Sequence, residues 1–262
     1  MKPPVLSEPL FWLVSVPAVL LFGIGKGGFG GAVAILAVPL MALVMSPVQA
    51  AAILLPILVL MDVVVVRTFW GHFDWRALRR LLPGAVLGIS LGYYSVGLLD
   101  ESALRLLVGL VAITFGLLTL LGLQAVTGRE HHAGTALFFG TLSGYTSFSI
   151  HAGGPPLTMY LLPKSLPPMM FVGTAGVFFA VVNALKLYPY YLLGQFDTDN
   201  LLYSLVLMPL APIGVRIGHW LVLHSRPAVY YRIIAVFLVL VGIKLTADGL
   251  GLGWTVSSIA AG

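Results

Sequence analysis

Long apolar segments follow one another along almost the whole chain, and no other feature restricts the fold so strongly. Short turns separate ten of them, which lie at residues 10–22, 32–45, 48–70, 77–99, 101–123, 135–150, 153–163, 167–194, 199–223 and 228–250. Of the 262 residues 59% are hydrophobic and 9% are charged, whereas a soluble domain carries about 25% charged residues. The pattern predicts an all-α, polytopic integral membrane protein, because helices satisfy their own backbone hydrogen bonds in lipid.

Charge and cysteine content exclude several other classes of protein. A net charge of +5 in a membrane protein is typical of the excess of Lys and Arg on its cytoplasmic side, so we expect no nucleic-acid partner. The chain has no cysteine, which excludes disulfides, thiolate catalysis and cysteine-based metal sites. We expect no cofactor and no metal. Membrane lipid is an expected partner, and a homodimer is left open as an assembly.

The two halves of the chain resemble each other. WGHFDW at 70–75 is similar to LGQFDT at 193–198, an offset of 123 positions. A second set of matches has an offset of 126 and pairs Pro83, Gly88, Gly92 and Gly116 with Pro209, Gly214, Gly218 and Gly242. The sequence therefore predicts a first membrane repeat at 1–123, a cytoplasmic linker at 124–134 and a second membrane repeat at 135–262.

Equivalent loops of the two repeats carry opposite charge. The junction at 67–80 contains four arginines, whereas its counterpart at 194–200 contains two aspartates and no basic residue. The acidic junction at 99–102 likewise corresponds to a basic one at 224–232. Because basic loops stay in the cytoplasm, the two five-segment repeats are predicted to be inverted relative to each other.

Each repeat begins with two short segments that flank a glycine-rich stretch. The segments 10–22 and 32–45 have 13 and 14 residues, or roughly 20 Å of helix against a hydrocarbon core of ~30 Å. Between them lies GIGKGGFGGAV at 23–33, and SFSIHAGGPP at 147–156 takes the matching place. We expect half-length helices that meet at glycine-rich tips. Irregular backbone at membrane depth is tolerated where it lines a cavity.

The tips are candidates for an anion site. Glycine lets a ligand approach the main chain, and a helix that starts there presents free N–H groups. Lys26 adds a charge that is costly in a membrane. The candidate binding residues are Gly25, Lys26, Gly27, Gly28, Phe29 and Gly30 in the first tip, and Ser147, Ser149, His151, Gly153 and Gly154 in the second.

Close helix packing is the alternative role for these glycines. Packing is the preferred interpretation for the glycines at 88, 92, 214 and 218 in the sequence. For the first tip packing leaves Lys26 unexplained, although this side chain could extend to the membrane interface instead.

Polar residues also interrupt two later segments. Asp62 stands in ILVLMDVVVV, and Asn183 and Lys186 share one face of a helix in the corresponding segment of the second half. We expect Asn183 and Lys186 to line the cavity and Asp62 to act in coupling, as a charge partner or proton carrier. The alternative is a structural ion pair of Asp62 with Lys186 or Arg67. Three nearby tyrosines, 188, 190 and 191 in the sequence, are typical of a membrane interface.

Catalytic motifs are absent from the sequence. Ser147, Ser149 and His151 are neighbours, but the chain has no Gly-x-Ser-x-Gly motif, no His-x-x-x-His helix and no paired carboxylates that would support catalysis. The sequence therefore favours a protein that is not an enzyme.

Several motifs together resemble the TauE/SafE family of bacterial sulfite exporters, which are also described as anion permeases. They are GIGKGGFGG, GHFDWR followed by PGAVLGISLG, SFSIHAGGPPLTMYLLP, VGTAGVFFAVVN and GQFD. Many members have Gly where this chain has Lys26, so it is similar to a branch with GxxKGGF and HAGGPP motifs. The glycine motifs of the family fall on Gly23–Gly31 and Ser149–Pro156.

The resemblance implies a multi-pass transporter of the bacterial inner membrane that exports sulfite or a small organosulfonate. We expect alternating access at the interface of the repeats. A transporter of another small organic anion and an anion channel are the alternatives, and a membrane enzyme or a scaffold is the alternative from another class.

Overall fold

The computed structural model describes residues 9–31, 34, 37–41, 44–95, 98, 100–121, 133–224 and 227–252. Within these ranges all regular structure is helical, which confirms the all-α prediction. Most of the linker predicted at 124–134 lies outside the described residues.

The helices follow the predicted segments closely. The first half contains α1 (Pro9–Gly28), α2 (Ala37–Met41), α3 (Pro47–Thr68), α4 (Trp75–Tyr94) and α5 (Glu101–Leu120). The second half contains α6 (Ala133–Ile150), α7 (Gly154–Leu161) with the short turn η3 (Leu162–Lys164), α8 (Pro168–Leu192), α9 (Thr198–Leu207), α10 (Leu210–His224) and α11 (Pro227–Gly249).

Polar residues in the junctions set where helices begin. Ser46, Asp74 and Asp197 are the N-caps of α3, α4 and α9, and their side chains accept hydrogen bonds from backbone amides at 3.1, 3.0 and 2.8 Å. These bonds satisfy N–H groups that the first turn of a helix leaves free. The two aspartates belong to the repeated GHFD and GQFD motifs. Each half of the sequence therefore contains the same signal for the start of a helix.

Within the part of the chain that the structure describes, three helices are long and apolar enough to cross a membrane: residues Pro9–Gly28, Val48–Thr68 and Pro168–Leu192. The pair α9 and α10 is a fourth candidate if it forms one span, although the two helices are bent by 45°. The sequence predicted one continuous segment at 199–223. Pro209 at the break has no N–H for the helical ladder and its ring crowds the preceding turn, which explains the interruption.

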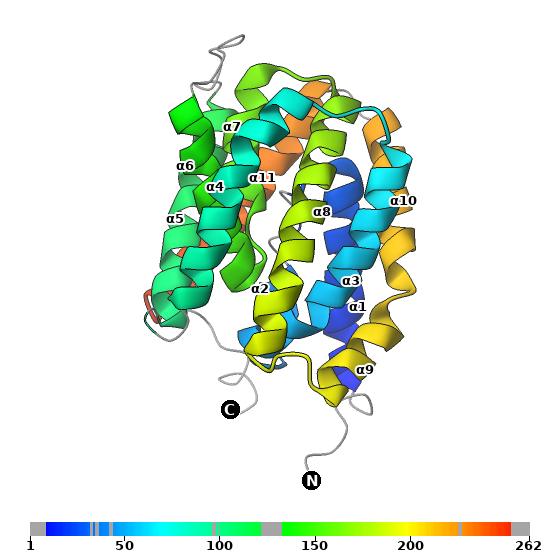
Figure 1. Cartoon of the computed structure of the whole chain (residues 1–262), viewed down its shortest axis with the longest axis vertical. Coiled ribbons are helices and arrows are strands. Elements are labelled where there is room, and N and C mark those ends of the chain that lie inside the picture. Colours follow the sequence, from blue (N-terminus) through cyan, green and yellow to red (C-terminus); the bar gives the residue numbers. More distant parts are fainter. Residues whose placement is uncertain are drawn as a thin grey trace.

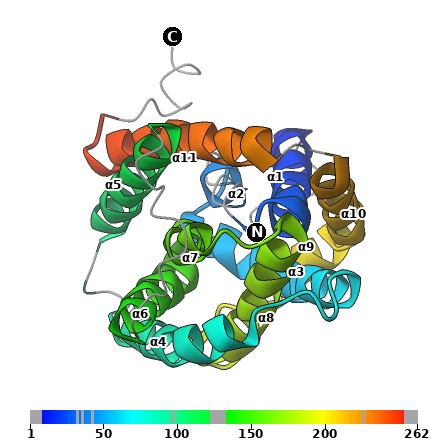
Figure 2. The same cartoon turned by 90° about the horizontal axis from the view of Figure 1, so that it is seen from above.

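Helices of the two predicted repeats pack against each other in pairs. The pairs are α1 with α10, α4 with α6, α5 with α11 and α3 with α8, and each takes one helix from either half. The longer helices surround the short helices α2 and α7, which lie inside the ring (Figure 2).

The directions of equivalent helices differ. In Figure 1, α3 runs from the bottom of the molecule to the top, and α8 runs from the top to the bottom. Opposite directions are what an inverted repeat requires. The orientation of the repeats in the membrane stays a prediction.

Glycines bring the backbones of paired helices together. A Cβ atom at Gly88 would lie 2.1 Å from the Thr141 carbonyl oxygen, and one at Gly218 would lie 2.4 Å from that of Ile24. Gly92 and Gly214 are equally crowded, against Phe148 and the Leu20 carbonyl. Close packing, the interpretation preferred for these four glycines, is confirmed.

The first helix is longer than the sequence suggested. We expected it to end near residue 22, but α1 continues through the glycine motif to Gly28 and has 20 residues, or about 30 Å. Its glycines stay helical because they face α10: a Cβ at Gly27 or Gly28 would lie 2.2 or 2.4 Å from a carbonyl oxygen there. Helix α6, with 18 residues, is also longer than half a span. The short members are α2 and α7, with 5 and 8 residues.

Candidate functional site

Four charged or histidine side chains lie buried among the helices that the structure describes. Lys26, Asp62, His151 and Lys186 come from α1, α3, the turn after α6, and α8, and each is at most 5% exposed. A buried charge without a partner is costly. The contacts of these four groups therefore determine what the site can do.

Lys26 and Asp62 form a buried ion pair. The Lys26 ammonium also donates to the Leu58 carbonyl at 3.3 Å, and the Asn183 amide donates to the second oxygen of Asp62 at 2.7 Å. Asp62 thus pairs with Lys26, and the pairings with Lys186 or Arg67 that the sequence suggested are wrong. The packing of α1 on α3 decides this choice, since it brings together residues that are 36 positions apart.

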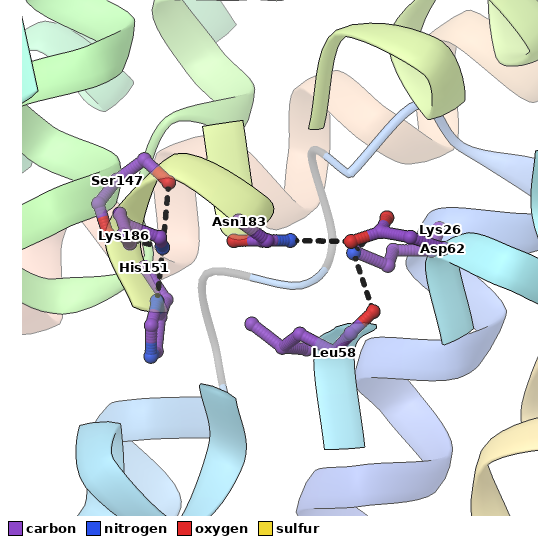
Figure 3. Close-up of polar contacts among 7 residues, drawn as sticks. All are labelled: Lys26, Leu58, Asp62, Ser147, His151, Asn183 and Lys186. Atoms are coloured by element: carbon purple, nitrogen blue, oxygen red, sulfur yellow. Dashed lines mark hydrogen bonds and ion pairs between the residues drawn. The ribbon is translucent and has the colours of Figure 1, made fainter. Parts of the chain in front are cut away.

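Lys186 lies in a second cluster (Figure 3). Its ammonium contacts three acceptors, the carbonyl and hydroxyl oxygens of Ser147 at 3.0 and 3.1 Å and Nδ1 of His151 at 2.8 Å. Three is the number of hydrogens that an ammonium can donate. Among the described residues Lys186 makes no ion pair with a carboxylate. Asn183 lies between this cluster and the Lys26–Asp62 pair (Figure 3).

The hydrogen bonds of His151 assign its proton. A lysine ammonium only donates, so Nδ1 of His151 must accept from Lys186. Nε2 lies 2.9 Å from the Ala51 carbonyl oxygen, to which it must donate. With Lys186 as an ammonium, the hydrogen bonds assign the ring one proton, on Nε2, and leave it neutral.

The turns after α1 and α6 have the same geometry. Gly30 and His151 have φ angles of 57° and 54°, in the left-handed region that usually requires glycine. In each turn the next amide returns to a helix carbonyl, Gly31 to Gly25 at 2.9 Å and Ala152 to Thr146 at 3.1 Å. A non-glycine residue in this region costs about 1–3 kcal/mol and is often functional. The two ring contacts of His151 hold it there.

A narrow cavity of about 10 Å³ lies between the two clusters, enough for about one water molecule. Five of the predicted site residues line it: Lys26, Ser147, His151, Gly154 and Asn183. Of its other lining residues, Gly31 belongs to the glycine motif, whereas the sequence did not indicate Phe22, Ala34, Leu58 and Phe179. These are apolar or small and look like any other residue of a membrane helix.

The remaining predicted residues lie outside the cavity lining. Gly25, Gly27, Gly28, Phe29, Gly30 and Gly153 are buried in packing contacts or turns, and Asp62 and Lys186 reach the cavity through Lys26, Asn183, Ser147 and His151. Ser149 faces elsewhere, since its hydroxyl donates to the Tyr145 carbonyl of its own helix at 3.0 Å.

Tyr190 belongs with the buried cluster. We expected it at the membrane interface together with Tyr188 and Tyr191, which are indeed exposed. Tyr190 instead is buried, donates to the Phe148 carbonyl at 2.7 Å and stacks on the His151 ring. Tyr188 and Tyr191 are three positions apart and share one face of α8, whereas Tyr190 lies on another face. This spacing in the sequence could have indicated that Tyr190 is buried.

Among the residues that the structure describes, no group of three or more His, Cys, Asp or Glu side chains could hold a metal ion. The polar groups of the site are dominated by donors: two ammonium groups, a hydroxyl and an amide. The arrangement is suited to a small anion.

Apolar helices around an internal cavity with buried charges are the features of a helical membrane protein. The profile of the family described as sulfite exporter TauE/SafE matches residues 15–245, and the chain belongs to this family. It is also 30% identical over 178 residues to the probable inner membrane transporter protein TsaS of Comamonas testosteroni, covering 66% of this chain and 72% of the relative. No solved structure matches the chain.

The comparisons confirm the resemblance seen in the sequence motifs. They also place the chain among multi-pass proteins of the bacterial inner membrane. Membership of a transporter family points away from an enzyme.

Proposed function

We propose that this protein exports a small sulfur oxyanion, sulfite or an organosulfonate, across the inner membrane by alternating access. The observation that carries the proposal is Lys186, a fully buried ammonium group that makes no ion pair with any described carboxylate. A cation in a membrane protein interior is costly and calls for a compensating negative charge. A transported anion supplies that charge.

Two donors face the cavity next to which Lys186 lies. The Ser147 hydroxyl oxygen accepts from Lys186, and its own proton has no acceptor among the described residues, so it can be donated to an anion. Gly154 is the first residue of α7 and lines the cavity, and no side chain caps this helix. The start of a helix carries partial positive charge and favours an anion.

The comparisons support sulfite or a sulfonate as the substrate, because the family is described as sulfite exporters. The fold supports alternating access. Helices from both halves enclose the cavity, equivalent helices run in opposite directions, and the cavity has room for about one water molecule, which is less than an oxyanion needs. A conformation with a wider cavity must therefore form for the anion to enter.

Flux measurements with the purified protein in proteoliposomes test this proposal. We expect sulfite flux that saturates with concentration. Conductance that does not saturate would identify an anion channel, and conversion of sulfite to a product without flux would identify an enzyme. Flux of small carboxylates but not of sulfite would assign another organic anion as the substrate.

A further inference from the structure

We infer that the buried site accepts anions with a single negative charge and discriminates against dianions. This inference rests on the proposed function and specifies the substrate class of the same site. Its basis is the balance of charge among the side chains around the cavity.

The charges of the site leave one positive charge uncompensated. Lys26 and Asp62 neutralise each other as an ion pair. His151 is neutral, because its Nδ1 accepts from Lys186 and its Nε2 faces the Ala51 carbonyl. Lys186, taken as an ammonium group, has three uncharged acceptors and no carboxylate partner among the described residues. These four are the charged or histidine side chains that the structure describes as buried, so the net charge is one.

A monoanion neutralises this site completely. A dianion would leave one negative charge in the interior of the protein, where an uncompensated charge is poorly solvated. Lys26 cannot supply the missing charge without giving up Asp62, which would then be buried without a partner. The ion pair therefore sets the charge of the site, and Lys186 is the group that attracts the anion.

For sulfite this selects the protonated form, HSO₃⁻, over SO₃²⁻, and for organosulfonates it selects those with one acidic group. Export of HSO₃⁻ also moves one proton with each sulfur atom. Proton movement in this form does not require Asp62 to titrate.

Calorimetric titration of the purified full-length protein tests the inference with two probes of fixed charge, methanesulfonate and sulfate, at equal ionic strength. We expect methanesulfonate to bind at least tenfold more tightly than sulfate. Sulfate binding as tight as that of methanesulfonate, or tighter, would overturn the inference and leave anion transport standing. If the protein binds neither methanesulfonate nor sulfite, the proposed function fails as well.

Variants identify which buried charge binds the anion. Lys186→Met should weaken methanesulfonate binding at least tenfold, whereas Lys244→Met, which removes a charge from the exposed pair of Lys244 with Asp248, should not change it. The double variant Lys26→Met and Asp62→Asn removes two opposite charges and should keep the preference for methanesulfonate, even if both affinities fall. Unchanged binding in Lys186→Met would overturn the inference, as would a lost preference in the double variant with a native circular-dichroism spectrum.

Discussion

At the scale of single residues, the Lys26–Asp62 pair changes the expected role of Asp62. The sequence suggested a coupling residue that acts as a charge partner or proton carrier. The structure gives Asp62 two polar contacts, one through each carboxylate oxygen: a buried ion pair with Lys26 and a hydrogen bond from Asn183. Removal of one partner leaves the other as an isolated buried charge, which costs more than loss of the whole pair.

We therefore predict that Asp62→Asn destabilises the folded protein by about 3–5 kcal/mol, the range for a broken buried pair. The measurement is chemical or thermal unfolding of the purified protein in detergent. The double variant Lys26→Met and Asp62→Asn should recover most of the loss, because no charge remains unpaired. If Asp62→Asn is as stable as the wild type, the ion pair does not contribute to the stability of the folded protein.

Sequence reasoning identified the residues of the network but not their partners. Lys26, Asp62, Asn183 and Lys186 stand out because each interrupts an apolar segment. Their pairing depends on how α1, α3 and α8 pack, and the sequence suggested Lys186 or Arg67, not Lys26, as the partner of Asp62. The left-handed conformation of His151 could not be read from the sequence either, since glycine is the usual residue at that position.

At the scale of helices, the glycine motif has two roles that the sequence did not separate. Up to Gly28 its glycines are helical and let α1 approach α10, whereas Gly30 and Gly31, with φ of 57° and 84°, turn the chain away from the helix. A cluster of glycines fits both a broken helix and a tightly packed one. Only the partner helix decides which form is adopted at each position.

The packing role predicts the effect of a single methyl group. A Cβ at Gly28 would lie 2.4 Å from the Gly218 carbonyl oxygen, so Gly28→Ala must separate α1 from α10 and should cost about 1–3 kcal/mol. Gly134→Ala in α6 is the matched control, because a Cβ there meets nothing within 4 Å. Thermal unfolding should show a loss for Gly28→Ala alone. Equal stability of the two variants would contradict the packing of these helices.

At the scale of the whole molecule, the predicted internal repeat rests on N-cap motifs and a glycine pattern that occur twice in the sequence. The prediction that the repeats are inverted depends on the charge of the junctions. These charges determine how a chain is oriented in the membrane, and the packing of the helices does not require them. The opposite directions of α3 and α8 agree with this prediction (Figure 1). Sidedness in the membrane needs its own experiment.

Single cysteines can locate the junctions, since the natural chain has none. His72 and Asp199 are exposed residues in equivalent junctions. We predict that an impermeant thiol reagent added to intact cells labels Asp199→Cys, and that His72→Cys reacts only after the inner membrane is opened. Labelling of both positions from the same side would contradict the inverted repeat.

The central claim is that an anion crosses the membrane through the cluster of Ser147, His151 and Lys186, and two serines on one helix test it most directly. The Ser147 hydroxyl has a proton to donate into the cavity, whereas the Ser149 hydroxyl is bonded to its own helix. A hydrogen bond to a charged group contributes about 1.5–3 kcal/mol.

The measurement is the concentration dependence of sulfite flux in proteoliposomes that contain equal amounts of wild-type protein, Ser147→Ala or Ser149→Ala. We predict that Ser147→Ala needs roughly ten- to a hundredfold more sulfite for half-maximal flux, and that Ser149→Ala matches the wild type. Equal flux curves for Ser147→Ala and Ser149→Ala would contradict the account.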